Sequence, residues 1–316
     1  MRRVAVIYNP MSGQFSKRRA LAVDEALAVL RDGGVEADAL ETDAPGSASV
    51  LAKAAIRNRY DTILACGGDG TVHEVLQCLV GTETALGVLP LGTANALAQN
   101  LGLGRNPVNA ARLLLKAEPM EIPVGQIFYR DSAGQEQSRF FTVAAGIGAD
   151  ALLMSSLDPG LKRRLGYAIY LLEAFKIWAT NPFPLFCVAF TTDGTPEKRQ
   201  EKVSQLLAIR VRSFGGVLRE FAPGATLRNP TLSLMAFKTR SRIRFLRFLL
   251  AVVAHRHTFS REVELIDAVA VECRDCDGSR TKQYVEADGE VLGTLPARME
   301  VARQTVRLLV PPNAKP

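Results

Sequence analysis

The first 120 residues alternate between two hydrophobic patterns, and this alternation limits the fold more than any other feature of the sequence. Short apolar runs typical of buried strands are separated by longer segments with helical spacing. The predicted strands are residues 3–9, 35–42, 61–66 and 85–91, and the predicted helices are residues 17–34, 48–58, 71–80, 93–102 and 107–117. Strands separated by helices predict an α/β domain with a parallel sheet and helices on both faces.

One strand-to-helix junction, ILACGGDGTVHEVLQCL at 63–79, carries three glycines in its turn. The apolar run 63–66 predicts a buried strand, and apolar residues at 72, 75, 76, 79 and 80 predict a helix. Because glycine permits positive φ and adds no side chain, the backbone of Gly67, Gly68 and Gly70 can close on an anion at the helix N-terminus. The turn therefore predicts a phosphate-binding loop.

Three other loops of this domain also come directly after a predicted strand. Asn9-Pro10, Thr42 and the stretch PLGTAN (90–95) each follow a predicted strand, as the glycine turn does. In parallel sheets, ligands bind beyond the carboxyl ends of the strands. We therefore expect a nucleotide site at this edge of the sheet.

From Glu121 onward the pattern changes to the alternation of antiparallel strands, interrupted by helical segments around 161–180 and 239–257. We place a domain boundary near Pro123, which gives an α/β domain over 1–123 and a β-rich domain over 124–297. Residues 298–316 form a last strand-like run. The sequence leaves open whether this run returns to the first domain.

Composition narrows the range of partners and compartments. The 39 Lys and Arg residues against 32 Asp and Glu residues give a net charge of +7, which suits nucleic acid, anionic lipid or nucleotide phosphate as a partner. The five cysteines lack the spacing of a disulfide framework, which favours a reducing compartment. The apolar runs at the start and at 248–254 are too short for a signal peptide or a membrane span, so we expect a cytoplasmic protein.

Four motifs follow one another along nearly the whole chain: NPMSG (9–13), GGDGTVHEV (67–75), PLGTANALA (90–98) and EADGEVLG (286–293). NAD kinases and phosphofructokinases share GGDG, but the four motifs in this order resemble the diacylglycerol kinase catalytic family, which includes bacterial lipid kinases and sphingosine kinases. The resemblance implies a nucleotide-binding α/β domain followed by a β-sandwich domain for the lipid, with the active site in the cleft between them. It also implies ATP and Mg²⁺ as cofactors.

The resemblance also assigns roles within the first domain. Asp69 would hold the Mg²⁺ of the nucleotide directly or through water, although an Asp before Gly can be only a turn residue. The amides of residues 67–71 and the helix dipole would screen the phosphates, and Thr71 is also a candidate helix N-cap. The expected nucleotide-binding set is Asn9, Pro10, Ser12, Gly13, Thr42, Gly67, Gly68, Asp69, Gly70, Thr71, Val72, His73, Glu74, Gly92, Thr93 and Asn95.

The second domain carries the motif that matches the family's proton acceptor. Glu290 in Asp288-Gly289-Glu290 would take the proton of the acceptor hydroxyl as its oxygen attacks the γ-phosphorus, and Asp288 would support Glu290 or the metal. An Asp-Gly dipeptide between two strand-like runs also predicts a plain β-hairpin turn. Both interpretations remain open from the local sequence.

Two positions depart from the family pattern. The family usually has an aspartate after GTxN, but here Ala96 follows Asn95. In the bacterial relatives the region corresponding to 221–234 reads roughly P-D-A-x-x-x-D-G-x-L, and its second Asp helps backbone carbonyls bind a structural Mg²⁺; here that position is Asn229. An amide lacks the charge that a Mg²⁺ site needs, so we expect at most a weakened remnant of Thr226, Asn229 and Thr231.

Two further patterns are less specific. Cys273 and Cys276 form C-x-x-C downstream of His255 and His257, but without a second C-x-x-C we expect reduced thiols rather than a zinc site. The segments 161–178 and 238–257 combine basic and apolar residues, which is typical of a helix on an anionic membrane and equally of a packed helix with a solvated basic face.

Together these features predict an ATP-dependent lipid kinase that phosphorylates diacylglycerol or a related lipid. Its expected partner is a lipid at the inner face of the membrane, with no nucleic acid; a homodimer stays open. Two alternatives are an NAD kinase-like enzyme and a non-catalytic regulator that binds nucleotide or lipid. The late DGE motif argues against the first, and Ala96 and Asn229 are the best support for the second.

Overall fold

The computed structural model describes residues 1–10, 17–156, 168–192, 198–214, 221–253, 263–276 and 282–314. The chain forms two compact units: unit 1 contains Met1–Val124 and Arg303–Pro316, and unit 2 contains Gly125–Ala302. The end of the chain, which the sequence could assign to neither domain, thus belongs to unit 1.

Unit 1 is built on a parallel sheet. Strands β1 (Arg3–Tyr8), β2 (Glu36–Glu41), β3 (Thr62–Gly67) and β4 (Ala85–Pro90) lie in the order β2-β1-β3-β4, and the last residues of β15 (Glu290–Val310) pair with β4 in parallel. All residues of β3 and β4 are buried, because helices cover both faces. The predicted α/β fold with a parallel sheet is confirmed.

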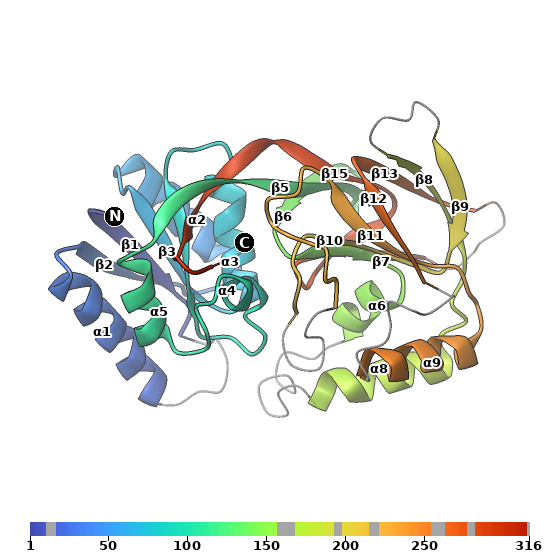
Figure 1. Ribbon diagram of the computed structural model, residues 1–316, viewed down its shortest axis with the longest axis horizontal. Coiled ribbons are helices and arrows are strands. Elements are labelled where there is room, and N and C mark those ends of the chain that lie inside the picture. The colour runs from blue at the N-terminus through green and yellow to red at the C-terminus, as the bar shows by residue number, and fades with distance from the viewer. Residues whose placement is uncertain are drawn as a thin grey trace. The chain divides into compact units, whose positions relative to one another are not determined.

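Five helices connect these strands: α1 (Lys17–Asp32), α2 (Ser47–Arg57), α3 (Asp69–Leu79), α4 (Ala96–Asn100) and α5 (Pro107–Leu114). Helix α1 packs with α5 and α2 packs with α3, one pair on each face of the sheet (Figure 1). The prediction of a helix over 93–102 is wrong at its start, since Asn95 has φ +51° and α4 begins only at Ala96.

Unit 2 is a β-sandwich. Its strands are the second part of β5 (Glu118–Arg130), β6 (Glu136–Phe141), β7 (Ala144–Ile147), β8 (Phe186–Thr191), β9 (Arg199–Val203), β10 (Gln205–Ile209), β11 (Leu232–Phe237), β12 (Val263–Ala268), β13 (Ala270–Asp275), β14 (Tyr284–Ala287) and the first part of β15. One antiparallel series runs β12-β11-β10-β7-β14-β15, and a second runs β9-β8-β13-β15. Side chains from both series, among them Phe186, Phe190 and Leu234, fill one buried core.

Three described helices pack on this sandwich: α6 (Ala149–Ser156), α8 (Ala168–Thr180) and α9 (Arg242–Val253). Helix α9 buries Phe248 and Val252 against the outer face of β10 and β11, where the rings of Phe248 and Phe237 meet edge to face at 4.3 Å. Helix α8 is joined to α9 by a hydrogen bond from the Trp178 indole to the carbonyl of Arg242. None of the helices in the described segments has the length and hydropathy that a bilayer crossing requires.

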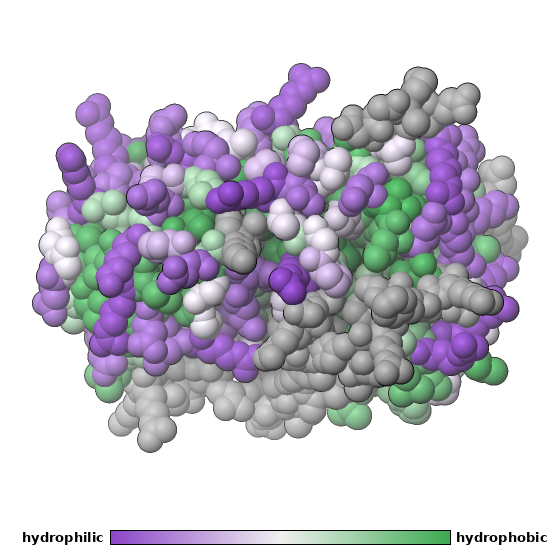
Figure 2. Space-filling model, in the orientation of Figure 1, coloured by the Kyte–Doolittle hydropathy of each residue, from purple (hydrophilic) through white to green (hydrophobic). Residues whose placement is uncertain are grey.

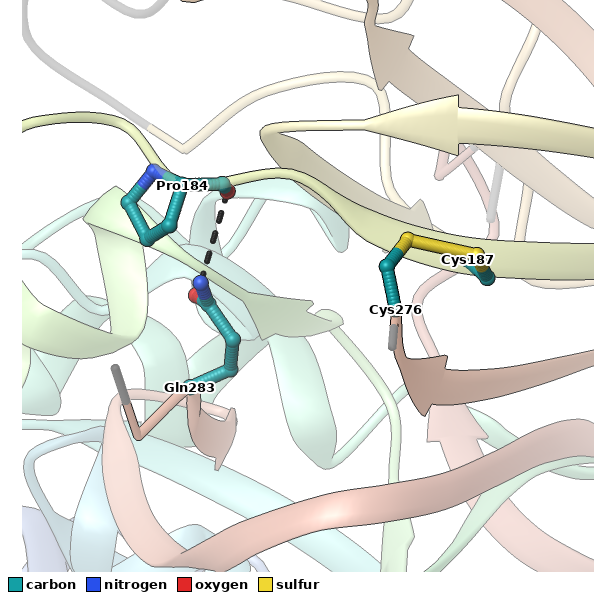
Figure 3. The surroundings of a disulfide bond; sticks show 4 residues. All are labelled: Pro184, Cys187, Cys276 and Gln283. Carbon is teal, nitrogen blue, oxygen red and sulfur yellow. Dashed lines mark hydrogen bonds between the residues drawn. A yellow bond between two sulfur atoms is a disulfide. The ribbon is translucent and has the colours of Figure 1, made fainter. Parts of the chain in front are cut away.

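The cysteines differ from the expectation of reduced thiols. Cys187 on β8 and Cys276 at the end of β13 form a disulfide across neighbouring strands (Figure 3). Close by, the amide of Gln283 donates to the carbonyl of Pro184. Cys273 is a buried free thiol, His255 and His257 lie outside the described residues, and the described residues contain no cluster of three or more metal-ligating side chains. The expectation of a reduced Cys276 is therefore wrong.

Candidate functional site

The glycine turn of unit 1 joins β3 directly to α3. Gly68 is the N-cap residue of α3, and Asp69, Gly70 and Thr71 form the first helical turn, so the helix begins two residues before the predicted start at residue 71. A Cβ on Gly67 would lie 2.4 Å from the hydroxyl oxygen of Thr71. Thr71 is therefore not the N-cap; it packs under the turn, and the N-cap has no side chain to block the helix N-terminus.

A second loop, between β4 and α4, lies against this turn. The N–H groups of Leu91 and Gly92 both donate to the carbonyl of Gly67, at 2.9 and 3.2 Å. A Cβ on Gly92 would stand only 2.4 Å from the Cα of Gly68. The two loops are thus in backbone contact, and this contact requires glycine at position 92.

The carboxylate of Asp69 holds the same second loop. Its two oxygens accept the N–H groups of Asn95 and Ala96, at 3.0 and 2.8 Å, and so cap the N-terminus of α4. The Asn95 side chain closes the loop by accepting from the N–H of Gly92 and donating to its carbonyl. Asp69 is therefore more than the turn residue of an Asp-Gly dipeptide, because it fixes two loops relative to each other.

The other predicted loops meet at the same edge of the sheet. Asn9, just after β1, donates its N–H to the carbonyl of Cys66 on β3, and Thr42, just after β2, donates its N–H to the carbonyl of Tyr8. Pro10 and Thr93 are half-buried in their loops. Ser12 and Gly13 lie outside the described residues.

The side chains of three members of the expected nucleotide-binding set have packing or capping roles in the structure. Val72 and His73 are buried in α3, at 5% and 2% exposure. The Glu74 carboxylate accepts the N–H groups of Gly46 and Ala48 and thereby caps α2. These three side chains stabilise the helices behind the loop.

The contact between the two loops leads to a testable prediction. Replacing Gly92 by Ala forces the β4–α4 loop away from Gly68, which should lower the free energy of unfolding by about 1–3 kcal/mol and weaken nucleotide binding. Denaturant unfolding and nucleotide titration calorimetry would measure both effects. Gly224→Ala is the matched control, since a Cβ there meets nothing within 4 Å; equal behaviour of the two variants would contradict the assigned role of the contact.

In unit 2 the DGE motif forms a tight hairpin between β14 and β15. Ala287 pairs with Glu290, and the two turn residues Asp288 and Gly289 have φ values of +50° and +87°, as a type I′ turn requires. The hairpin that the sequence offered as an alternative is thus present. It leaves Glu290 half-buried as the first residue of β15.

The Asp288 carboxylate binds backbone within unit 2. One oxygen accepts the N–H groups of Val143 and Ala144, at 2.8 and 3.1 Å, and the other accepts the N–H of Thr142 at 3.0 Å. The N–H of Asp288 donates in turn to the carbonyl of Ala144. The Asp288 carboxylate therefore fixes the turn that precedes Glu290 on the β6–β7 connection.

A pair of buried carboxyl groups, Glu286 and Asp150, lies next to this turn and was not predicted. Glu286 on β14 accepts the N–H of Gly289, and Asp150 stands in the first turn of α6. A Cβ on Gly146 would lie 1.6 Å from one oxygen of Asp150 and 2.9 Å from one of Glu286, so both side chains occupy the space that this glycine leaves. The sequence signal was weak, because Glu286 and Asp150 are 136 positions apart and only the fold brings them together.

Burial raises the pKa of both groups. The pKa of Asp150 rises to about 7, mainly through desolvation, and the nearby N–H groups of Ala151 and Asp150 itself offset this rise only in part. The pKa of Glu286 rises through desolvation, then through the charges of Asp150 and Asp288, while the N–H of Gly289 lowers it. At neutral pH the pair therefore retains a proton.

This pair makes stability depend on pH. A carboxyl group whose pKa is higher in the folded than in the unfolded state destabilises the fold as pH rises between the two pKa values, here from about 4 to about 7 for Asp150. Because of Asp150, the unfolding free energy of the native protein should fall by about 2–3 kcal/mol between about pH 5 and pH 8. The Asp150→Asn variant should lack this part of the fall. Urea unfolding at the two pH values measures this. Asp267→Asn, at an exposed carboxylate of the same unit, is the control, and parallel pH profiles for native protein and Asp150→Asn would contradict the assignment.

The segment before β11, where relatives are expected to hold a structural Mg²⁺, does not fit that ion here. The carbonyl oxygens of Leu227, Asn229 and Thr231 all accept hydrogen bonds from one guanidinium, that of Arg210. The amide of Asn229 accepts from the Thr226 hydroxyl and donates to the carbonyl of Gly224. Three carbonyl oxygens of this segment are thus already bound to a cation of the chain.

Comparison with known families agrees with both units. Residues 3–127 match the family described as the diacylglycerol kinase catalytic domain, and residues 142–310 match the family described as the YegS C-terminal NAD kinase beta sandwich-like domain. Residues 3–127 thus form a diacylglycerol kinase catalytic domain, and the chain, more than half of which matches the second model, belongs to the YegS C-terminal NAD kinase beta sandwich-like family. The resemblance stated from the four motifs and the predicted β-sandwich are therefore confirmed.

Individual relatives cover almost the whole chain. The chain is 27% identical to a diacylglycerol kinase of Bacillus subtilis (strain 168), over 98% of this chain and 97% of the relative, and 29% identical to one of Mycobacterium tuberculosis (strain ATCC 25618 / H37Rv), over 98% and 95%. These names support a kinase, which implies a nucleotide substrate.

Two solved structures share the fold. A crystal structure of a diacylglycerol kinase from Bacillus anthracis strain Sterne superposes with a TM-score of 0.68 at 19% identity, over 99% of this chain and 98% of that one. Yeast NADH kinase in complex with NADH superposes more distantly, with a TM-score of 0.51 at 11% identity, over 98% of this chain and 83% of the other.

Proposed function

We propose that the protein is an ATP-dependent lipid kinase that transfers the γ-phosphate of MgATP to a lipid hydroxyl, most simply that of diacylglycerol. The observation that carries this proposal is the turn of residues 67–71, an uncapped helix N-terminus at the carboxyl edge of a parallel sheet. Such a terminus offers N–H donors and a positive dipole end to phosphate oxygens. The match of residues 3–127 to the diacylglycerol kinase catalytic domain supports the reaction class.

In this proposal Mg²⁺ binds together with the nucleotide, as MgATP. The Asp69 carboxylate, whose oxygens accept the N–H groups of Asn95 and Ala96, would bind Mg²⁺ directly or through a water of its hydration shell. Ala96 contributes only its N–H, so the carboxylate usual in the family after Asn95 is missing. Asp69 is then the one carboxylate in the β3–α3 turn and the β4–α4 loop. Mg²⁺ would offset the negative charge of the β- and γ-phosphates.

Glu290 is the proposed proton acceptor. The lipid hydroxyl oxygen attacks the γ-phosphorus, the bond from that phosphorus to the bridging β–γ oxygen breaks, and ADP leaves with the electron pair. The hydroxyl proton passes to the Glu290 carboxylate. The hydrogen bonds of Asp288 and Glu286 to the backbone around the turn limit the positions that Glu290 can take.

Glu290→Gln tests this role. Glutamine keeps the shape and much of the hydrogen bonding but cannot accept the proton, so kcat should fall roughly 10²–10⁴-fold with ATP affinity unchanged. Steady-state turnover on lipid vesicles and nucleotide titration measure the two quantities. The acid limb of the pH profile should also disappear. Turnover within about twofold of native would mean that Glu290 is only a hairpin residue, since changes at such positions seldom cost more than about 0.5 kcal/mol.

The lipid is proposed to reach the enzyme at a membrane surface that contacts α8 and α9. Leu172, Phe175, Ile243 and Leu250 are 59–71% exposed, which is unusual for large apolar side chains. Lys176, Arg242, Arg244 and Arg247 are exposed beside them. Figure 2 shows hydrophobic and hydrophilic atoms next to each other along the edge formed by these two helices. Apolar side chains flanked by cations suit an anionic bilayer.

We expect the double variant Phe175→Ser/Ile243→Ser to bind anionic phosphatidylglycerol vesicles at least about tenfold more weakly, because each buried apolar side chain contributes about 1.5–3 kcal/mol. Vesicle co-sedimentation measures binding, and turnover of a soluble short-chain diacylglycerol should stay unchanged. Val50→Ser is the control, an equally exposed apolar side chain of unit 1. Native-like vesicle binding by the double variant would show that the surface lies elsewhere.

The two alternatives have less support. An NAD kinase-like activity has the distant structural likeness to yeast NADH kinase in its favour, and that likeness concerns the fold alone. A non-catalytic regulator is favoured by Ala96. Turnover of labelled ATP with diacylglycerol vesicles, compared with NAD as acceptor, separates all three functions.

A further inference from the structure

Arg210 is a fully buried cation that no sequence motif indicated. It follows β10, its N–H donates to the carbonyl of Val143, and its side chain is 1% exposed. Burial lowers the pKa of its guanidinium to about 10, which still leaves the group charged at neutral pH. A buried charge is costly, so its partners must compensate for the lost water.

Those partners include three backbone carbonyls of one short segment. One guanidinium nitrogen donates to the oxygens of Leu227 and Asn229, at 2.8 and 3.1 Å, and the other terminal nitrogen donates to the oxygen of Thr231 at 3.2 Å. The planar fork of a guanidinium suits several acceptors at once, and hydrogen bonds to a charged donor are stronger than neutral ones. The positive charge of Arg210 therefore holds three carbonyl groups of the segment before β11 close together.

The resemblance to the bacterial lipid kinases implies that an aspartate and nearby backbone carbonyls of this segment hold a structural Mg²⁺. Here that aspartate is Asn229, whose amide is engaged within its own segment by Thr226 and Gly224. The change from carboxylate to amide lowers the negative charge of the segment by one, and Arg210 brings a single positive charge in place of a double one. A metal ion beside the guanidinium would be repelled, since like charges a few ångströms apart disfavour each other strongly where water is excluded.

We propose that Arg210 permanently supplies the cation that relatives hold at this place as Mg²⁺, so that unit 2 keeps its fold without a divalent metal. A side chain cannot dissociate, so the order of the 227–231 segment does not depend on the concentration of an ion. The proposal is independent of the lipid kinase activity, because it concerns the stability of unit 2. In this proposal Arg210 is the structural cation of unit 2, and Mg²⁺ binds only together with the nucleotide.

Thermal unfolding with EDTA and with millimolar MgCl₂, in the absence of nucleotide, tests the proposal. The native protein should have the same unfolding midpoint in both buffers. Arg210→Met keeps much of the side-chain volume but leaves the three carbonyls without their donors, and should lower the midpoint by about 5–15 °C. Arg240→Met is the control, an exposed arginine of the same unit, and should leave the midpoint unchanged.

The double variant Arg210→Met/Asn229→Asp restores the family's arrangement. Its midpoint should rise with MgCl₂ and fall with EDTA, and titration calorimetry should find a Mg²⁺ site that the native protein lacks. If Arg210→Met does not fold, Arg210→Lys serves instead: it keeps the charge with fewer donors and should lower the midpoint by less. A native midpoint that falls with EDTA, or an Arg210→Met midpoint equal to that of the native protein, would overturn the proposal.

Discussion

The backbone contact between Gly68 and Gly92 is the constraint on which the candidate nucleotide site depends. The loops can approach this closely only because position 92 carries no side chain, since a Cβ there would stand 2.4 Å from the Cα of Gly68. Once they touch, the N–H groups of the second loop reach the carbonyl of Gly67, and the Asp69 carboxylate caps the helix that follows. The turn of residues 67–71 is therefore held in place by a neighbouring loop, and its own sequence does not reveal this support.

In unit 2 the Asp288-Gly289 turn is also stabilised by carboxylates that accept backbone N–H groups. Asp288 fixes the turn to the β6–β7 connection, and Glu286 accepts the N–H of Gly289. In both units, carboxylates at family motifs stabilise loops as well as offering charge. This explains how one motif can be both a structural turn and part of a site. The buried partner of Glu286, Asp150, makes the second arrangement sensitive to pH.

Arg210 illustrates how a family position can change while the fold persists. The segment before β11 needs a positive charge at its carbonyls, and either an ion or a side chain can meet that need. Asn229 alone suggests a lost site, whereas Arg210 and Asn229 together indicate a replacement. The two residues are 19 positions apart, so the connection between them follows only from the fold.

The sequence by itself determined the parallel sheet of unit 1, the glycine turn at the end of β3 and the family, because hydrophobic period and glycine spacing act locally along the chain. It also located Glu290 and the hairpin that carries it. Only the tertiary structure decided that Glu74 caps α2, that Asp150 meets Glu286 at Gly146, that Cys187 pairs with Cys276, and that β15 ends in unit 1. Each of these contacts joins residues distant in the chain, and their approach depends on packing, which leaves no periodic signal in the sequence.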